Sequence, residues 1–308
     1  MASSERTINR KARLRSVAAN LSNTSFGGIV MMILATGVFA TQDAITKTLS
    51  HELPVAQIVF VRFLAFLLFA ALLAHRGGGA RRALRSNVPF RQVLRCLLMC
   101  SEIALFAYAL RFIGLADIHA LFACFPLFVA ALSVPLLGEH VGKRRWLAVL
   151  VGLIGTLIIL RPGSDVFRIV ALLPLACAFI YALYNLLTRL VSRHDTFRTS
   201  LLYFGLVGTC ASLPFAVVSW QPVDGRQAIY LASLCATSVV GHMTLIRALQ
   251  LTEAVVLQPF HYLILPWAMI IGVVFFGESL DLVTVSGALI VVGSGVYIAV
   301  REYQTRAD

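Results

Sequence analysis

Long apolar runs separated by short polar segments make up most of the chain. A membrane-crossing helix needs roughly 20 residues, most of them apolar. Ten runs approach or reach this length, at residues 27–49, 55–75, 92–112, 115–137, 146–161, 168–190, 199–219, 228–249, 254–276 and 282–301. Little sequence remains between them. The pattern therefore predicts an all-α integral membrane protein with ten transmembrane helices.

One pattern of residues occurs twice, at a shift of 139 to 140 positions. The first copy is Ala109-Leu110, Pro126, Gly138-Glu139, Gly155 and Arg161, and the second is Ala248-Leu249, Pro266, Gly277-Glu278, Gly295 and Arg301. Upstream, Asp43-x-x-Thr46-Lys47 aligns with Asn185-x-x-Thr188-Arg189 at a shift of 142. Because each copy holds an odd number of spans, the second copy enters the membrane from the opposite side. We expect a basic tail at 1–25, a first repeat at 26–162 and an inverted second repeat at 163–303.

Composition and charge support this class. Hydrophobic residues make up 59% and charged residues 13%, against typical soluble values of about 45–50% and about 25%. Of the 26 Lys and Arg residues, 20 fall on the side of the N-terminus and five on the other. This bias predicts that both termini are cytoplasmic. The net charge of +12 then faces anionic membrane lipid and predicts no nucleic-acid partner. Because no small-residue cleavage site follows the first apolar run, the basic segment is interpreted as a tail and not as a signal peptide.

Sequence motifs of enzymes and of redox or metal sites are missing from the chain. It holds no Gly-x-x-x-x-Gly-Lys loop, no His-Glu-x-x-His and no Gly-x-Ser-x-Gly, so hydrolysis and nucleotide-driven transport are poorly supported. All cysteines fall in predicted spans, and the four-residue spacing of Cys96 and Cys100 fits neither a redox site nor a zinc site. They are interpreted as packing residues. We expect no enzyme activity, no cofactor and no metal.

The duplicated five-helix unit, with its proline-containing helix, its Gly-Glu turn (Gly138-Glu139 and Gly277-Glu278) and its glycine-rich closing helix, resembles the drug/metabolite transporter superfamily. Within it the chain resembles the ten-helix EamA-type exporters, and most of all the bacterial YddG-type amino-acid exporters. This resemblance implies a basket of helices around a central cavity. It also implies alternating access without ATP.

Ionisable side chains within the spans are the first candidates for a functional site, since each costs roughly 2.5–3.5 kcal/mol to insert. Glu102 is the deepest. It lies ten residues into its predicted helix, which places it about 15 Å from one edge and near the midplane. Burial there favours the neutral carboxyl, so Glu102 is predicted to be protonatable in the working range. The alternative is a neutral or paired carboxyl with a structural role.

Topology predicts two further polar clusters, one in each half of the bilayer. The outer cluster is Asp43, Lys47, Arg62 and His119, and the inner cluster is Asn185, Arg189, His242, Gln258 and His261. Asp43 and Lys47 share one helix face and are expected to pair, the alternative being that Lys47 extends to the membrane surface. As a transport path, the clusters would be the outer and inner gates of one cavity. His242 and His261 either contact the substrate or a proton, or only bond a neighbouring helix.

Aromatic side chains complete the predicted site. Tyr181 and Asn185 share one helix face, and Gln258, His261 and Tyr262 share another, with Phe122 in the place of Tyr262 in the first repeat. Aromatic walls with a few polar groups suit amphipathic organic molecules, although core packing is the alternative for any one ring. The predicted substrate-binding residues are Glu102, His119, Phe122, Tyr181, Asn185, His242, Gln258, His261 and Tyr262.

Prolines and small residues mark the helix geometry. Pro126 and Pro266 lie in matching helices and Pro259 precedes the second. All three are predicted kinks, and matched interruptions point to a transporter's binding region. Small residues at four-residue spacing (Ala148, Gly152 and Thr156; Gly295 and Ala299) predict a close seam between the fifth and tenth helices or with another subunit.

These features together predict a secondary transporter in the bacterial inner membrane that exports small amphipathic metabolites. Amino acids, including aromatic ones, come first, because a zwitterion needs an acidic and a basic contact. Glu102 with His242 or His261 would supply both. The alternatives are a cationic drug exporter of the same superfamily and a non-transporting membrane scaffold. Substrate identity, energy coupling, direction of flux and oligomeric state stay open.

Overall fold

The computed structural model describes the backbone of residues 2–76, 84–137, 143–160, 169–252, 257 and 260–307, and leaves out the side chains of residues 2–25 and of some helix ends. Within these ranges the chain is helical and contains no strand. The helices are α1 (Ala2–Glu52), α2 (Val55–Arg76), α4 (Pro89–Ala109), α5 (Leu115–Phe122), α6 (Phe125–Leu137), α7 (Lys143–Leu160), η1 (Ile169–Ala171), α8 (Leu172–Val191), α9 (Phe197–Ser219), α10 (Gly225–Leu251), α12 (Ile264–Phe276) and α13 (Leu282–Ala307).

The described helices include seven that are long and apolar enough to cross a membrane. Three shorter apolar helices, Trp146–Leu160, Ile264–Phe276 and Leu282–Tyr297, lie where the remaining spans are predicted. The prediction of an all-α membrane protein is confirmed. The arrangement of ten spans in two inverted repeats stays a prediction.

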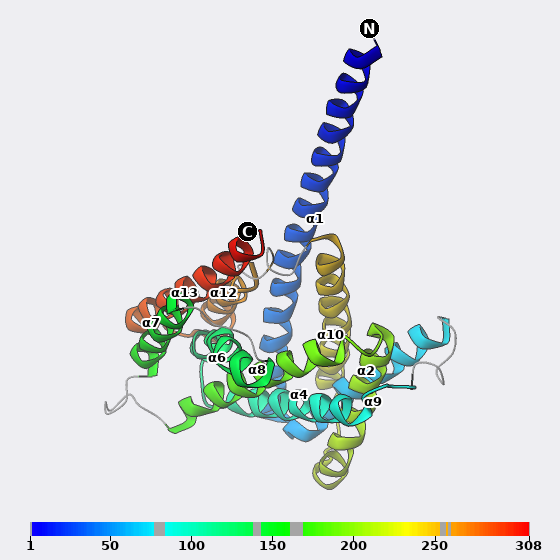
Figure 1. The fold of residues 1–308 in the computed structure, drawn as a ribbon. Coiled ribbons are helices and arrows are strands. Elements are labelled where there is room, and N and C mark those ends of the chain that lie inside the picture. The colour runs from blue at the N-terminus through cyan, green and yellow to red at the C-terminus, as the bar shows by residue number, and fades with distance from the viewer. Residues whose placement is uncertain are drawn as a thin grey trace.

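The predicted basic tail is continuous with the first membrane helix. Its backbone continues α1 as helix from Ala2, and Figure 1 shows this part of α1 projecting well beyond the other helices. The apolar part of the same helix begins at Phe26. The boundary predicted at residue 25 is therefore a change of composition and not a break in the backbone.

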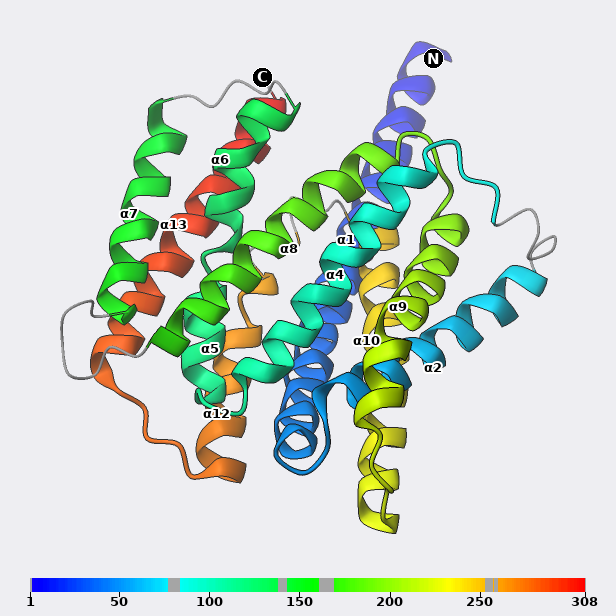
Figure 2. The ribbon, with the colours of Figure 1, turned by 90° about the horizontal axis from the view of Figure 1, so that it is seen from below.

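Helices from the two halves of the chain pack against each other throughout the bundle. α1 packs on α10, α2 on α9, α4 on α8, and α7 on α13. Figure 2 shows both termini and the α8–α9 connection at one end of the bundle, which we call the terminal end. The α1–α2, α9–α10 and α12–α13 connections lie at the other end, which we call the far end.

Glycines permit the closest of these helix contacts. A Cβ atom on Gly205 of α9 would lie 2.6 Å from the Cα atom of Leu67 in α2. In the α7–α13 pair, a Cβ on Gly155 would lie 2.9 Å from the carbonyl oxygen of Gly287. The seam predicted between the fifth and tenth helices therefore exists within one chain, built around these two glycines.

Both proline-containing helices are interrupted near the middle of the bundle. α5 ends at Phe122 and α6 begins at Phe125, and the backbone before α12 turns at residues 262–263. Pro126 and Pro266 then lie in the first turn of the continuing helix, where the amide donor that proline lacks is not needed. The interruptions place Phe122 and His261 directly before these breaks.

Candidate substrate cavity

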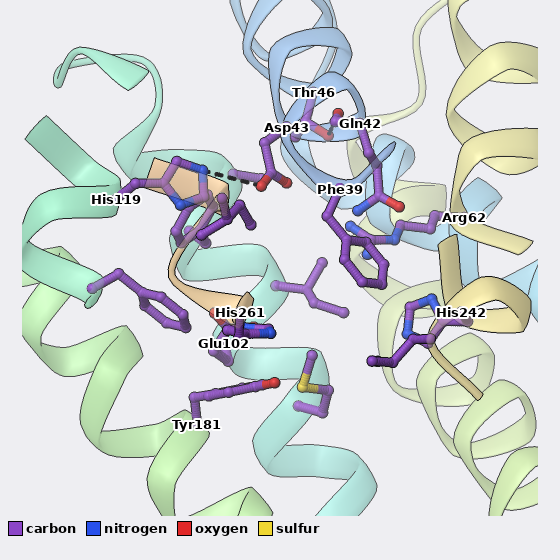
Figure 3. A pocket seen from close by; sticks show the side chains of 17 residues that line it. Phe39, Gln42, Asp43, Thr46, Arg62, Glu102, His119, Tyr181, His242 and His261 are labelled. Carbon is purple, nitrogen blue, oxygen red and sulfur yellow. Dashed lines mark hydrogen bonds and ion pairs between the residues drawn. The ribbon is translucent and has the colours of Figure 1, made fainter. Parts of the chain in front are cut away.

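A cavity of about 140 Å³ lies among α1, α2, α4, α5, α8, α10 and the segment before α12 (Figure 3). Its polar side chains come from both halves of the chain. They are Gln42, Asp43, Thr46, Arg62, Glu102, His119, Tyr181, His242 and His261. Its aromatic wall is formed by Phe39, Phe106 and Phe122.

Glu102 projects into this central cavity from α4, as predicted from its depth in the helix. Its residue is only 5% exposed, and among the described residues no group is a hydrogen-bond or ion-pair partner of its carboxyl. Figure 3 shows it beside Tyr181 and His261. A carboxyl placed in this way is available to a ligand.

Arg62 supplies the positive charge of the cavity. It lies on α2 and lines the same space as Glu102 and Asp43, and Figure 3 shows its side chain directed toward Gln42 and Phe39. Acidic and basic groups therefore meet in one small volume, where the low dielectric strengthens the interaction of each with an opposite charge.

Asp43 does not pair with Lys47, contrary to the prediction from their four-residue spacing. Its Oδ2 atom instead lies 3.2 Å from Nε2 of His119 on α5. The two groups are close enough for an ion pair but do not form a hydrogen bond, because neither ring nitrogen of His119 has a hydrogen-bond partner among the described residues. Asp43 faces the cavity because it lies on the face of α1 that packs toward α5.

The predicted inner histidines, His242 and His261, line the same cavity as Asp43, Arg62 and His119 of the predicted outer cluster. Nδ1 of His242 is 2.8 Å from the carbonyl oxygen of Ser238, and its ring packs edge-on against Phe39 and Phe66 at centroid distances of 5.3 and 4.9 Å. His261 packs edge-on against Phe125. Both predicted groups therefore contribute to one cavity, and their assignment to opposite halves of the bilayer stays a prediction.

Aromatic rings form one side of the central cavity. Phe122 lies 5.3 Å from Tyr181 and 5.6 Å from Phe106, centroid to centroid. Tyr181 also stacks on Tyr184, one turn further along α8, at 5.9 Å. Phe122 and Tyr181 thus contribute to both the core and the cavity wall, so the two interpretations of these rings do not exclude each other.

The remaining predicted binding residues lie outside the cavity lining. Asn185 donates from Nδ2 to the carbonyl oxygen of Tyr181, at 2.7 Å, so its side chain is directed along its own helix. Tyr262 packs against α13, where its ring leaves no room for a Cβ atom on Gly295. Gln258 and Pro259 fall outside the described residues.

Lys47 belongs to a cluster at the far end that the sequence did not predict. It donates to Glu278, which follows α12. Glu278 also accepts hydrogen bonds from the backbone N–H groups of Leu115 (2.8 Å) and Ala116 (3.3 Å) at the start of α5. The cluster therefore ties α1, α5 and the α12–α13 connection together.

Two glycines allow Glu278 to reach Lys47 and the start of α5. Gly277 ends α12 with φ of 62°, a left-handed conformation that turns the next residue back toward the bundle. A Cβ on Gly272 would lie 2.5 Å from Oε2 of Glu278, so that glycine makes room for the carboxylate. Burial alone would raise the pKa of Glu278, but the bonds from Lys47 and the α5 backbone hold it below its usual range. The repetition of Gly-Glu was the available sequence signal.

A second and larger cavity, of about 460 Å³, lies nearer the terminal end. It shares His242 and Leu245 with the central cavity. These two residues are therefore at the boundary between the two spaces.

Comparison with known proteins supports a transport role for this arrangement. The EamA-like transporter family model matches the chain twice, at residues 26–161 and 168–300. The riboflavin transporter of Vibrio cholerae is 31% identical over 255 residues, covering 81% of this chain and 85% of that protein. The S-adenosylmethionine uptake transporter of Rickettsia prowazekii is 26% identical over 285 residues, covering 92% and 96%.

Two further similarities extend the comparison. The pseudopaline exporter CntI of Pseudomonas aeruginosa is 28% identical over 273 residues, covering 86% of this chain and 93% of that protein. A solved crystal structure matches with a TM-score of 0.63 at 18% identity, over 93% of this chain and 99% of the other, which supports the fold alone. None of the relatives described here is an amino-acid exporter of the YddG type.

Proposed function

The chain belongs to the EamA-like transporter family, and we propose on that premise that it moves small zwitterionic, amphipathic metabolites across a membrane by alternating access. The observation that carries the proposal is the pairing of charges in the central cavity. Glu102 and Arg62 line the same space, and an aromatic wall completes it. Amino acids and metabolites that carry an amino-acid group fit this combination.

Each part of such a substrate has a partner of suitable chemistry. The guanidinium of Arg62 can bind a carboxylate with two parallel hydrogen bonds. The carboxyl of Glu102, which has no partner among the described residues, can accept from an ammonium group. Phe122 and Tyr181 offer ring faces to an apolar or aromatic side chain. This division of roles assigns the carboxylate to α2, the ammonium group to α4 and the apolar side chain to α5 and α8.

The central cavity is smaller than a typical ligand-binding site, which is expected if the helices around it are in a closed arrangement. Its volume of about 140 Å³ is below the roughly 300–1,000 Å³ typical of sites for drug-sized ligands. We infer that a substrate enters through a wider arrangement of the same helices. Alternating access supplies one, because each conformation opens the site to a single side.

The relatives' named substrates support a metabolite of this kind. S-adenosylmethionine carries an α-amino acid group and riboflavin carries a flat ring system, matching the charged and the aromatic parts of the cavity. Those names include uptake transporters and an exporter. Export, which the sequence resemblance implied, remains the proposed direction.

A cationic drug exporter is the weaker proposal. Asp43 and Glu102 would both attract a cation, but Arg62 in the same cavity would repel it. A zwitterion satisfies all three groups at once. The acidic and basic groups of the cavity together therefore favour the amino-acid class.

Location in the inner membrane with cytoplasmic termini is part of the proposal. It rests on the bias of basic residues, 20 to five, toward the side of the N-terminus. Single cysteines introduced on a cysteine-free background would be labelled from the cytoplasm at positions 78 and 143, and from outside at position 224. Labelling of position 78 from outside would overturn this orientation.

Flux into liposomes tests the transport function itself. Purified protein should accelerate the uptake of labelled amino acids over protein-free liposomes, and a quaternary ammonium compound should be transported more slowly than the best amino acid. The reverse order would favour a cationic drug exporter. Equal uptake with and without protein, for every metabolite tested, would favour a scaffold that transports nothing.

A further inference from the structure

The second cavity contains a buried arginine to which no role has yet been assigned. Arg95 lies on α4, six residues after its first residue, Pro89, or about 9 Å into the helix. It lines the cavity of about 460 Å³, and the residue is only 3% exposed. An arginine inside a membrane-spanning helix is costly and marks a functional site by default.

The hydrogen bonds of Arg95 leave part of its donor capacity unused. Nη2 donates to the carbonyl oxygen of Ser200 at 2.9 Å and to Oε1 of Gln92 at 3.1 Å. Nη1 reaches Oη of Tyr184 and Oγ1 of Thr188 only at 3.5 and 3.4 Å. Nε has no partner. Nη2 is therefore held by the protein, whereas Nη1 has only long contacts and Nε has none.

The charge of Arg95 has no carboxylate within ion-pair distance among the described residues. Asp195 lines the same cavity, but its oxygens accept from Ser86, from the backbone N–H of Asn87 and from Gln92. Burial would raise the pKa of Asp195, yet these hydrogen bonds lower it. Asp195, in the α8–α9 connection, is thus an ionised group whose hydrogen bonds go to the segment before α4 and to Gln92, and it does not neutralise Arg95 by direct contact.

The surroundings of Arg95 suit a carboxylate attached to an apolar group. The guanidinium lies 5.5 Å from the centre of the Tyr184 ring, which orients it. Phe66 and Phe204 line the same cavity, and His242 and Leu245 connect it to the central one. A substrate that passes between the two spaces would come within reach of Arg95.

We propose that Arg95, with Tyr184 and Thr188, binds the carboxylate of the substrate in the second cavity before or after its passage through the central cavity. This inference rests on the proposed function and adds to it a separate anion site nearer the terminal end. It assigns a carboxylate to the transported molecule. A purely cationic or neutral substrate would have no use for the site.

Binding of a probe with a carboxylate but no amino group tests this site, and substitution of Arg95 separates its contribution from that of Arg62 in the central cavity. The probe is 3-phenylpropionate, which offers a ring and a carboxylate, and 3-phenylpropionamide is its uncharged match. Binding is measured to the full-length protein in nanodiscs of phosphatidylcholine. The parent should bind the carboxylate at least about 10-fold more tightly than the amide, as expected for a hydrogen bond to a charged group.

Two substitutions on one helix form the main comparison. Arg95→Gln should weaken binding of the carboxylate by about 10- to 100-fold and leave binding of the amide unchanged. Arg91→Gln removes the same charge one turn earlier, at an exposed position, and should leave both unchanged. Equal behaviour of the two variants, or a parent that does not distinguish carboxylate from amide, would overturn the proposal.

Milder variants keep the test decisive if Arg95→Gln does not fold. Arg95→Lys retains the charge but not the fork of donors, and Tyr184→Phe removes only the hydroxyl. Both should weaken binding of the carboxylate by a smaller factor without changing the thermal stability. Loss of stability with unchanged affinity in both variants would instead assign Arg95 a purely structural role.

Two further measurements distinguish a lipid headgroup from a substrate as the source of the anion. They also distinguish failure of the anion site from failure of the proposed transport function. If phosphatidylglycerol in the nanodiscs abolishes binding of the probe, the site belongs to a lipid headgroup and the substrate assignment is wrong. If the parent transports amino acids in liposomes and Arg95→Gln does so at the parental rate, the anion site fails while the proposed function stands. Absence of flux in the parent would contradict the proposed function itself.

Discussion

The central cavity combines residues that are each expensive to place inside a membrane. Glu102, Arg62 and Asp43 line one volume, and Glu102 has no hydrogen-bond partner among the described residues. A buried carboxyl without partners lowers stability, so its retention points to a use that folding does not require. Binding of an ammonium group is the use that the neighbouring aromatic rings also support.

Replacement of Glu102 by Gln tests this role. The variant keeps the size and hydrogen-bonding capacity of the side chain but removes its charge. We therefore expect flux of the best amino acid substrate in liposomes to fall by about 10-fold or more. Expression and thermal stability should not fall. Flux is measured at matched protein content and across a series of pH values.

Two further variants at this position sharpen the result. Glu102→Asp keeps the charge on a shorter side chain and should retain part of the flux. Glu102→Leu should fold at least as well as the parent, because it removes an unpartnered polar group from the interior. If the Gln and Leu variants both transported at the parental rate across the pH series, Glu102 would be structural.

Some of these residues could be predicted from sequence and others could not. The sequence could single out four residues that line the cavity, because their depth in the apolar helices can be counted along the chain. They are Glu102, His119, Phe122 and Tyr181. The partner of Lys47 is 231 positions away, beyond the reach of any local pattern. Arg95 lies three residues into the span predicted at 92–112, so the sequence alone does not separate it from the basic residues that flank the spans, whereas its helix begins at Pro89.

Helix contacts in this bundle depend on where glycine replaces a side chain. Phe63 and Leu67 of α2 pack over Gly208 and Gly205 of α9, and a Cβ on Gly208 would lie 2.2 Å from the ring of Phe63. Without a hydrophobic effect between helices in lipid, close van der Waals packing provides much of their association. The α2–α9 contact should therefore be sensitive to a single methyl group.

Gly205→Ala tests this sensitivity. The added Cβ would lie 2.6 Å from the Cα of Leu67, and a backbone atom cannot move aside as a flexible side chain can. We expect a loss of about 1–3 kcal/mol, measured as a lower midpoint of thermal unfolding in detergent. Gly293→Ala is the matched control, because nothing lies within 4 Å of its added Cβ.

The control should change stability in the opposite direction. Alanine in an exposed helix position is more favourable than glycine by about 0.5–1 kcal/mol, so Gly293→Ala should be neutral or stabilising. Equal midpoints for the two variants would mean that α2 and α9 are less tightly packed than the structure indicates.

The element level was more predictable from sequence than the residue level. Matched prolines predicted interruptions in two helices, and the structure has breaks before Pro126 and Pro266. Small-residue spacing predicted the α7–α13 seam, although the backbones approach at Gly155 and Gly287 and not at the spaced pairs themselves. Spacing identifies the face of a helix, whereas the point of crossing depends on how the partner lies.

Packing of the whole molecule supports the proposed inverted repeat. Exchange of the two halves converts the contact of α1 with α10 into that of α8 with α4, and both contacts exist. It also converts the contact of α4 with α9 into that of α10 with α2, which again is present. The α2–α9 and α7–α13 pairs are converted into themselves. Contacts that are retained under this exchange are expected for two copies related by an axis between them.

A largely buried ion pair holds elements together at the far end of the molecule. Lys47 and Glu278 are 11% and 14% exposed at their side chains, and Glu278 also binds the first backbone N–H groups of α5. Glu139 and Arg189 occupy the corresponding positions in the repeat, although Glu139 lies outside the described residues. We infer that opening of the far end requires Glu278 to leave the start of α5.

Glu278→Gln should therefore favour opening at the far end. The variant removes the charge that binds Lys47 and that the start of α5 favours electrostatically. A single cysteine at position 46, which lines the central cavity as Thr46, reports opening through its reaction with a membrane-impermeant thiol reagent from that side. We expect labelling in the Gln variant to be about 5-fold faster or more, a change of about 1 kcal/mol.

Acid should have the same effect as this substitution. Bonds at the closed far end lower the pKa of Glu278 from its ordinary value of 4.5, so they stabilise closure at pH above that value and are lost as the pH falls below it. Because the thiolate fraction of the cysteine falls with pH in every variant, labelling is compared at each pH, and the ratio of the parent's rate to that of Glu278→Gln should rise toward one with acidification below about pH 4.5. Glu52→Gln is the control at the same end, because its partner Arg226 is 63% exposed and such pairs contribute little. If Glu52→Gln and Glu278→Gln were labelled at the same rate, the buried pair would not control access to the cavity.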